Sequence, residues 1–260
     1  MILETAGLFS AAGPLSLTAT TGTSLSLGPS PVITMLMLVG LGLLSFAFLM
    51  VSSFVKIAVV LSILRTAIGL NNIPPASVIT GLAVILSLFV MAPTLTEAGR
   101  ELKPALEVMG GDFSAETVKE KRKQELKAEE KMKILWDSFN RAKQPIKRFL
   151  ERHAHKSEKA MFMRMSRRSY REAGLGEVSE TSLAVLVPAF IISELKTAFQ
   201  IGFLLFIPFL VIDILVSNIL MALGMHMLSP TTISLPFKLL LFVMANGWYL
   251  LTQGLVSGYF

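Results

Sequence analysis

The chain has 260 residues, 53% of them hydrophobic, and a mean hydropathy of +0.64, which indicates a membrane protein and excludes an ordinary soluble domain. The absence of Cys excludes disulfides and thiolate metal sites. The net charge of +6 does not predict nucleic-acid binding, because 20 of the 24 Lys and Arg share a central segment with 15 of the 18 acidic residues and few aromatics.

The chain is predicted to begin with a leader and an apolar helical hairpin. Residues 1–30 are expected to be flexible or loosely packed, because a secretory signal would need a basic start and an unbroken apolar core. Residues 31–96 carry no charge apart from Lys56 and Arg65. Residues 71–75 are expected to turn the chain, since their two prolines cannot continue a helix. Each arm is long enough to approach the thickness of a bilayer.

Residues 97–182 form a polar, charged region that is expected to fold into amphipathic helices. Thr117 and Glu120 have the spacing of a capping box. Apolar residues then recur at three- and four-residue steps: Met132, Leu135, Trp136 and Phe139. Pro145 is expected to end this helix, with shorter helices after it. The nearly all-charged residues 119–133 predict a solvated helix face rather than a binding patch.

Residues 183–260 form a second apolar region and are predicted to be a second hairpin. Pro188 and Pro208 interrupt it and should kink its helices unless neighbours satisfy the freed carbonyl groups. Residues 224–230 are expected to turn the chain. The predicted fold is all-α and membrane-associated, with two long apolar helical hairpins flanking a polar helical region.

Six charged residues lie within the apolar regions: Lys56, Arg65, Glu194, Lys196, Asp213 and Lys238. A charge at the centre of a lone spanning helix costs about 2.5–3.5 kcal/mol, so such groups normally face protein or water. Glu194 and Lys196 are about 200° apart around a helix and need separate partners. Because basic residues outnumber acidic ones, we expect other partners from the polar region or from another chain, and therefore an oligomer. Snorkelling to the interface is the alternative for Lys56 and Arg65.

The charges near the two short turns predict an orientation. Lys56 and Arg65 flank the first turn, and Lys238 follows the second. By the positive-inside rule both turns should face the cytoplasm, which places the polar region on the other side of the membrane.

Long segments of both hairpins are distinctive. The second hairpin contains PAFIISELKTAFQIGFLLFIPFLVIDILVSNILMALGM, SPTTISLPFKLLLFV and GWYLL, and the first contains KIAVVLSILRTAIGLNNIPP and GLAVILSLFVMAPT. These segments resemble the FliP/SctR family, the pore-forming subunit of the flagellar and type III secretion export apparatus. Motifs of this length are highly specific. Ala92 and the LTQGLVSGY segment favour the injectisome branch.

The resemblance implies a helical homo-oligomer that forms a closed export gate with SctS/FliQ-like and SctT/FliR-like subunits and passes unfolded secreted proteins. Glu194 and Lys238 match family positions of intersubunit contact. A methionine cluster at the second turn seals the family's pore, and here it would fall on Met225 and Met227. His226 lies between them and either packs as the neutral form or charges and loosens the ring; we favour packing.

An oligomeric secondary transporter or ion channel subunit is the alternative, since Pro208 and Asp213 fit broken helices with midplane charges. An enzyme is not expected, because no HExxH, nucleophile elbow or glycine-rich phosphate loop occurs. His153 and His155 are not expected to bind metal, because residues two apart face different directions on a helix. We therefore predict no catalytic residue, no metal and no cofactor.

Overall fold

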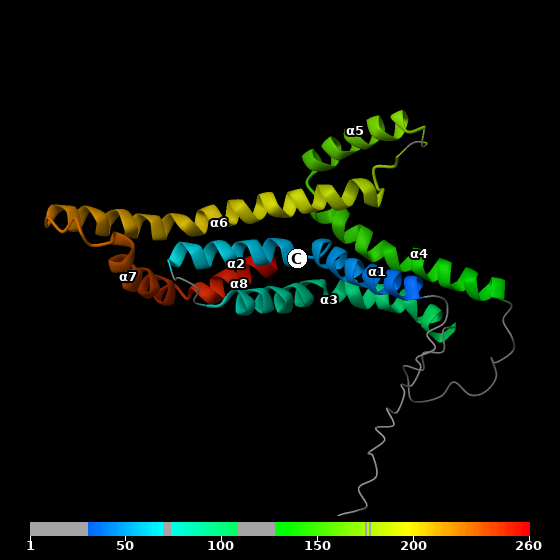
Figure 1. Ribbon diagram of the computed structural model, residues 1–260, viewed down its shortest axis with the longest axis horizontal. Coiled ribbons are helices and arrows are strands. Elements are labelled where there is room, and N and C mark those ends of the chain that lie inside the picture. Colours follow the sequence, from blue (N-terminus) through cyan, green and yellow to red (C-terminus); the bar gives the residue numbers. More distant parts are fainter. Residues whose placement is uncertain (1–30, 70–73, 109–127, 175, 177) are drawn as a thin grey trace, which may run out of the picture. The chain divides into compact units, whose positions relative to one another are not determined.

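The computed structural model describes residues 31–69, 74–108, 128–174, 176 and 178–260 (Figure 1). The predicted leader, the first residues of the first turn and the capping box at Thr117 and Glu120 lie outside these ranges. The chain divides into two compact units, residues 1–45 and 46–260. Helix α1 (Pro31–Met50) begins in the first unit, and its described side chains are apolar apart from Ser45 and largely exposed.

All of the described elements are helices, as predicted. After α1 they are α2 (Phe54–Ile68), α3 (Ala76–Val108), α4 (Ala128–His153), α5 (Lys156–Glu172), α6 (Leu183–Ala222), α7 (Pro230–Met244) and α8 (Gly247–Ser257). Within the described ranges, α3 and α6 are long and apolar enough to cross a membrane. The pair α7 and α8, bent by 60°, would make a third span if it acts as one.

The first predicted arm is two helices rather than one. It breaks at residues 51–53, where the Ser52 hydroxyl donates to the Leu49 carbonyl at 2.8 Å. Ser53 is fully buried and donates to the Ser87 hydroxyl of α3 at 3.1 Å, so the break is fixed by polar contacts. With 15 residues at about 1.5 Å each, α2 is shorter than the apolar core of a bilayer.

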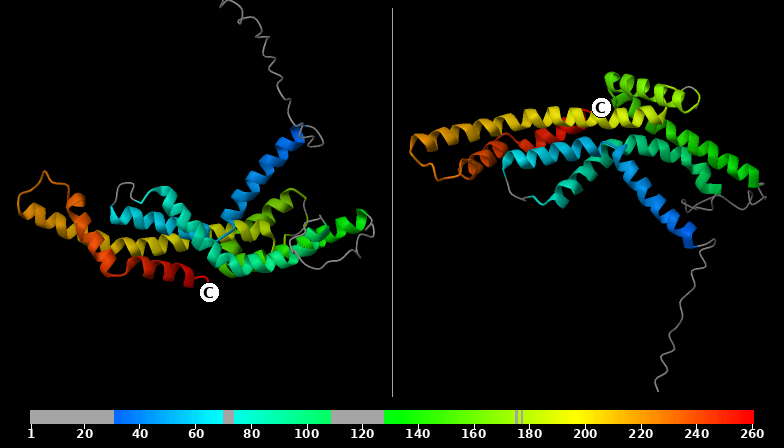
Figure 2. Two further views of the ribbon diagram at one scale, coloured as in Figure 1. Left: turned by 90° about the horizontal axis from the view of Figure 1, so that it is seen from below. Right: turned by 45° about the horizontal axis from the view of Figure 1, so that its top comes forward.

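The polar region differs from the prediction at Pro145, which lies inside α4 instead of ending it. Ile146, Phe149 and Leu150 continue the apolar stripe beyond the proline, and Phe149 and Leu150 are buried. Their packing offsets the single backbone hydrogen bond that the proline removes. In Figure 2, α4 lies along the second half of α3, and the two helices pack together.

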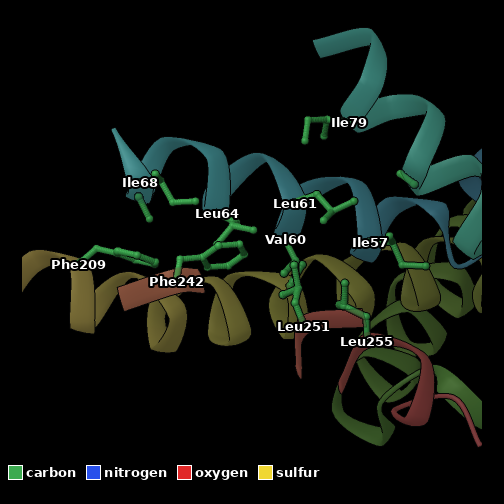
Figure 3. Packing of buried hydrophobic residues seen from close by; sticks show 13 residues of the cluster. Ile57, Val60, Leu61, Leu64, Ile68, Ile79, Phe209, Phe242, Leu251 and Leu255 are labelled. Carbon is green, nitrogen blue, oxygen red and sulfur yellow. The ribbon is translucent and has the colours of Figure 1, made fainter. Parts of the chain in front are cut away.

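The main core of the second unit lies between α2, α6 and the α7–α8 pair, with α3 beside α2 (Figure 3). The labelled core residues are Ile57, Val60, Leu61, Leu64, Ile68, Ile79, Phe209, Phe242, Leu251 and Leu255. Gly202 lets α6 approach α2 closely, because a Cβ at this position would overlap the Ile63 side chain. A second core around Leu150, Phe190 and Tyr259 joins α4 to α6 and to the residues after α8.

The second hairpin contains its predicted turn. Helix α6 ends at Ala222 and α7 begins at Pro230, with Gly224 in the left-handed region at φ 74°. Pro188 and Pro208 both lie inside α6, which continues through them for 40 residues. Residues 214–237, which carry no charge, are therefore divided between the end of α6, the turn and the start of α7.

Candidate functional site

The first buried charge cluster joins α2 and α6. Lys56 and Glu194 form an ion pair at 3.5 Å, with side chains only 6% and 4% exposed. The Tyr259 hydroxyl donates a hydrogen bond to the same carboxylate oxygen of Glu194. The Lys56 ammonium also lies 3.4 Å from the centre of the Tyr259 ring, within the range of a cation–π contact. Each ion thus has two partners in a site shielded from solvent.

The second cluster joins the two helices of the second hairpin to the end of α2. Lys238 of α7 donates to Asp213 of α6 at 2.6 Å and to the Ala67 carbonyl of α2 at 3.3 Å. The Ser234 hydroxyl donates to the other carboxylate oxygen of Asp213. The Lys238 side chain is 4% exposed, so this pair holds three helices together around a buried ammonium.

The third cluster connects the polar region to α6. Lys196 donates to Glu158 of α5 at 3.1 Å, and the backbone N–H of His155 donates to the Ser193 hydroxyl at 2.8 Å. Hydrogen bonds from Ser157 and then from Lys196 lower the pKa of Glu158 to about 2. This carboxylate therefore stays ionised and anchors the first turn of α5.

The structure decides between the sources of partners that the sequence left open. Glu194 and Lys196 have separate partners on different helices, as their spacing predicts. The polar region supplies one of the missing acids, Glu158. Arg65 is half-buried in the last turn of α2. The charge count alone therefore no longer requires a second chain, and the assignment of Glu194 and Lys238 to intersubunit contacts stays a prediction.

The predicted gasket residues lie apart from all three clusters. Met225, His226 and Met227 are exposed in the turn between α6 and α7, and Met227 is 99% exposed. The turn lies at one end of the second hairpin in both Figure 1 and Figure 2. These side chains are free to meet other molecules there.

The two histidines considered for metal binding have different surroundings. His153 packs its ring against Phe149 and Tyr259, with centroid distances of 4.6 and 5.0 Å. His155 Nδ1 lies 3.8 Å from a carboxylate oxygen of Glu158. Across the described ranges, no three His, Asp or Glu side chains gather where they could hold a metal ion.

Sequence reasoning missed Tyr259 and assigned no ion-pair role to Glu158. The spacing of Leu251, Leu255 and Tyr259 at four-residue steps could have indicated that Tyr259 continues the buried face of α8. No local pattern could have paired Glu158 with Lys196, because 38 residues separate them.

These features define a class: a helical membrane protein whose apolar helices carry shielded ion pairs and whose second hairpin ends in an exposed methionine-rich turn. Comparison with known proteins identifies the family. The model of the FliP family matches residues 36–255, and this chain belongs to that family.

Curated relatives agree with this membership. The hypersensitivity response secretion protein HrcR of Ralstonia nicotianae is 39% identical over 84% of this chain and 93% of its own. The Yop proteins translocation protein R of Yersinia pestis is 42% identical over 84% and 92%. The flagellar biosynthetic protein FliP of Bacillus subtilis is 38% identical over 81% and 84%. Flagellar and secretion relatives match at similar identity, so the injectisome branch stays a prediction.

Proposed function

We infer that this chain is a core subunit of the export gate of a type III protein secretion system. The family match over residues 36–255 carries this conclusion, because it includes both apolar hairpins and the polar region. The names of the relatives, which refer to secretion, translocation and flagellar biosynthesis, agree with it. The long apolar helices α3 and α6 make it a membrane protein.

Several copies, together with SctS/FliQ-like and SctT/FliR-like subunits, would form a closed pore for unfolded secreted proteins. Support comes from the large apolar side chains that α6 leaves exposed along its length, such as Phe199, Phe203 and Leu215. Faces of this kind need lipid or protein to cover them. The same proposal places the protein in the bacterial inner membrane, with α4 and α5 on the periplasmic side.

The constriction of this pore would be the exposed turn between α6 and α7. Methionine suits a seal around varied chains, because its unbranched thioether side chain adapts to different shapes. Met225 and Met227 are both exposed there and are not needed for packing within the chain. His226 between them is exposed as well and would pack against its neighbours in the ring.

Replacement of both methionines tests this role. We expect Met225→Ala/Met227→Ala to raise the leakage of small solutes across membranes that contain the assembled gate, because shorter side chains leave a gap. Met244→Ala is the matched control, since Met244 is 76% exposed on α7 but lies outside the turn. Equal leakage in the double variant and the control would contradict the seal. Substrate-dependent uptake of a small solute by the purified chain alone would favour the transporter alternative.

A further inference from the structure

Helix α8 is attached to the rest of the second unit through one narrow stripe. Leu251 and Leu255 are buried, while most of the other α8 side chains are partly or fully exposed. Tyr259 lies four residues beyond Leu255, two residues past the end of the helix, and is only 5% exposed. Of these three side chains, Tyr259 is the one that makes polar contacts.

The packing beside α8 is incomplete. An apolar pocket of about 320 Å³, partly open at the surface, lies between α8, α6, α7 and the end of α2, and it is lined by residues that include Leu205, Phe209, Leu250 and Gly254. Side chains that line such a pocket lack the dispersion contacts that close packing within the chain would supply. The attachment of α8 therefore depends more strongly on the contacts just beyond its C-terminal end, where Tyr259 lies.

Tyr259 meets three other helices at that end. Its hydroxyl donates to Glu194 of α6, and its ring face lies 3.4 Å from the Lys56 ammonium of α2. Phe149 and His153 of α4 contact the ring, with centroid distances of 6.0 and 5.0 Å. Burial and the nearby Glu194 carboxylate raise the pKa of the Tyr259 phenol, so the hydroxyl keeps the proton that it donates.

We propose that Tyr259 is a positioning residue that fastens α8 to α2, α4 and α6 by holding the buried Lys56–Glu194 pair between its ring and its hydroxyl. Loss of this side chain would release α8 and expose the pair to water at the same time. The second hairpin and the polar region are thereby linked through one side chain. The proposal concerns the chain itself and does not depend on the export function.

A single introduced Cys can report the opening of the contacts around Tyr259, because the chain itself has no Cys. Ala154 is 5% exposed and belongs to the same apolar cluster as Tyr259, so Ala154→Cys places a small buried thiol there. The rate of maleimide labelling of the full-length chain in detergent then follows the population of the open form. Ala160→Cys, at an exposed position on α5, gives the labelling rate of an accessible thiol.

In the Ala154→Cys chain, we expect Tyr259→Phe to speed labelling roughly tenfold, because it removes a hydrogen bond to a charged group while keeping the ring. Tyr259→Leu removes the cation–π contact as well and should speed labelling further. Amides of α8 should exchange hydrogen faster in both variants. Tyr249→Phe is the matched control, since Tyr249 lies on α8 but is 66% exposed, and it should leave both rates unchanged.

The same substitution in a chain that lacks the ion pair distinguishes the proposed role of Tyr259 from a role in packing alone. In a Lys56→Met/Glu194→Leu chain the ion pair is absent and the buried Tyr259 hydroxyl has lost its acceptor, so Tyr259→Phe should no longer speed labelling. An equal acceleration with and without the pair would overturn the proposal, because Tyr259 would then act through packing alone. Unchanged labelling and exchange in Tyr259→Leu would overturn it as well.

Discussion

The cost of an ion in an apolar helix depends on how completely its partner shields it. Lys238 is nearly fully buried and bonds to Asp213 and to the Ala67 carbonyl, whereas the Lys196 side chain is 50% exposed beside Glu158. Removing one member of a buried pair leaves an uncompensated charge, but an exposed pair contributes little. The two lysines of the second hairpin should therefore respond differently to the loss of their counter-ions.

We expect Asp213→Leu to lower the free energy of unfolding by about 3–5 kcal/mol, because it leaves the buried Lys238 ammonium without its counter-ion. Glu158→Gln should cost much less, because the Lys196 ammonium that it leaves behind is half-exposed. Denaturation of the detergent-solubilised chain would measure both. A Lys238→Met/Asp213→Leu variant should recover most of the lost stability, and a double variant as unstable as the single one would contradict a role for the buried charge.

A histidine gives the stability of the chain a dependence on pH. Burial, followed by the nearby charges of Lys56 and Arg152, lowers the pKa of His153 from 6.5 to about 4. As the pH falls, the unfolded chain takes up this proton before the folded chain does. The stabilisation is therefore complete above pH 6.5 and is lost between pH 6.5 and about 4.

His153→Phe should flatten the dependence of the thermal midpoint on pH in this interval, because it removes the group that titrates. His155→Gln is the matched control, as His155 lies two residues further along the chain and is exposed. Thermal unfolding between about pH 7.5 and 4 would compare the variants. A slope in His153→Phe as steep as that of the parent chain would assign the pH dependence to other groups.

At the scale of elements, close helix approach in this chain relies on a glycine. The Cβ of any other residue at position 202 of α6 would overlap Ile63 of α2, while a Cβ at Gly81 of α3 would meet no atom within 4 Å. Small residues at such contacts let helices in membranes pack tightly. Substitution by Ala should therefore have opposite effects on stability at these two positions.

We expect Gly202→Ala to destabilise the chain by about 1 kcal/mol or more, because overpacking outweighs the gain in helix preference. Gly81→Ala should stabilise it by about 0.5–1 kcal/mol. Unfolding of the two variants under identical conditions would measure the difference. Ile63→Val, which removes the methyl group that the added Cβ would meet first, should partly rescue Gly202→Ala; no rescue would place the strain elsewhere.

The helices also show where sequence patterns give limited information. The break at residues 51–53 contains no proline, glycine or charge, and it forms because Ser52 and Ser53 find polar partners on α1 and α3. Pro145 has the opposite outcome, since packing of the stripe beyond it keeps α4 continuous. Tertiary contacts can thus break a helix where the sequence has no helix-breaking residue, and they can keep a helix continuous through a proline.

At the scale of the whole molecule, the surfaces that remain apolar after folding favour assembly with other subunits. When this chain is extracted together with co-expressed export-apparatus partners, we expect a particle several times heavier than the 28.4 kDa chain. Mass measurement in detergent, with the detergent contribution subtracted, would test this. A stable single chain in the presence of the partners would contradict the proposed gate.

The sequence alone determined the membrane class, the all-helical fold, the second hairpin and its turn, because apolar runs and turn residues act locally. It also determined that Glu194 and Lys196 need different partners, since helix geometry fixes their directions. Only the tertiary structure decided that these partners are Lys56, Tyr259 and Glu158, all within the same chain. Partners of buried charges are set by the packing of helices distant in sequence, and periodicity along one helix does not specify that packing.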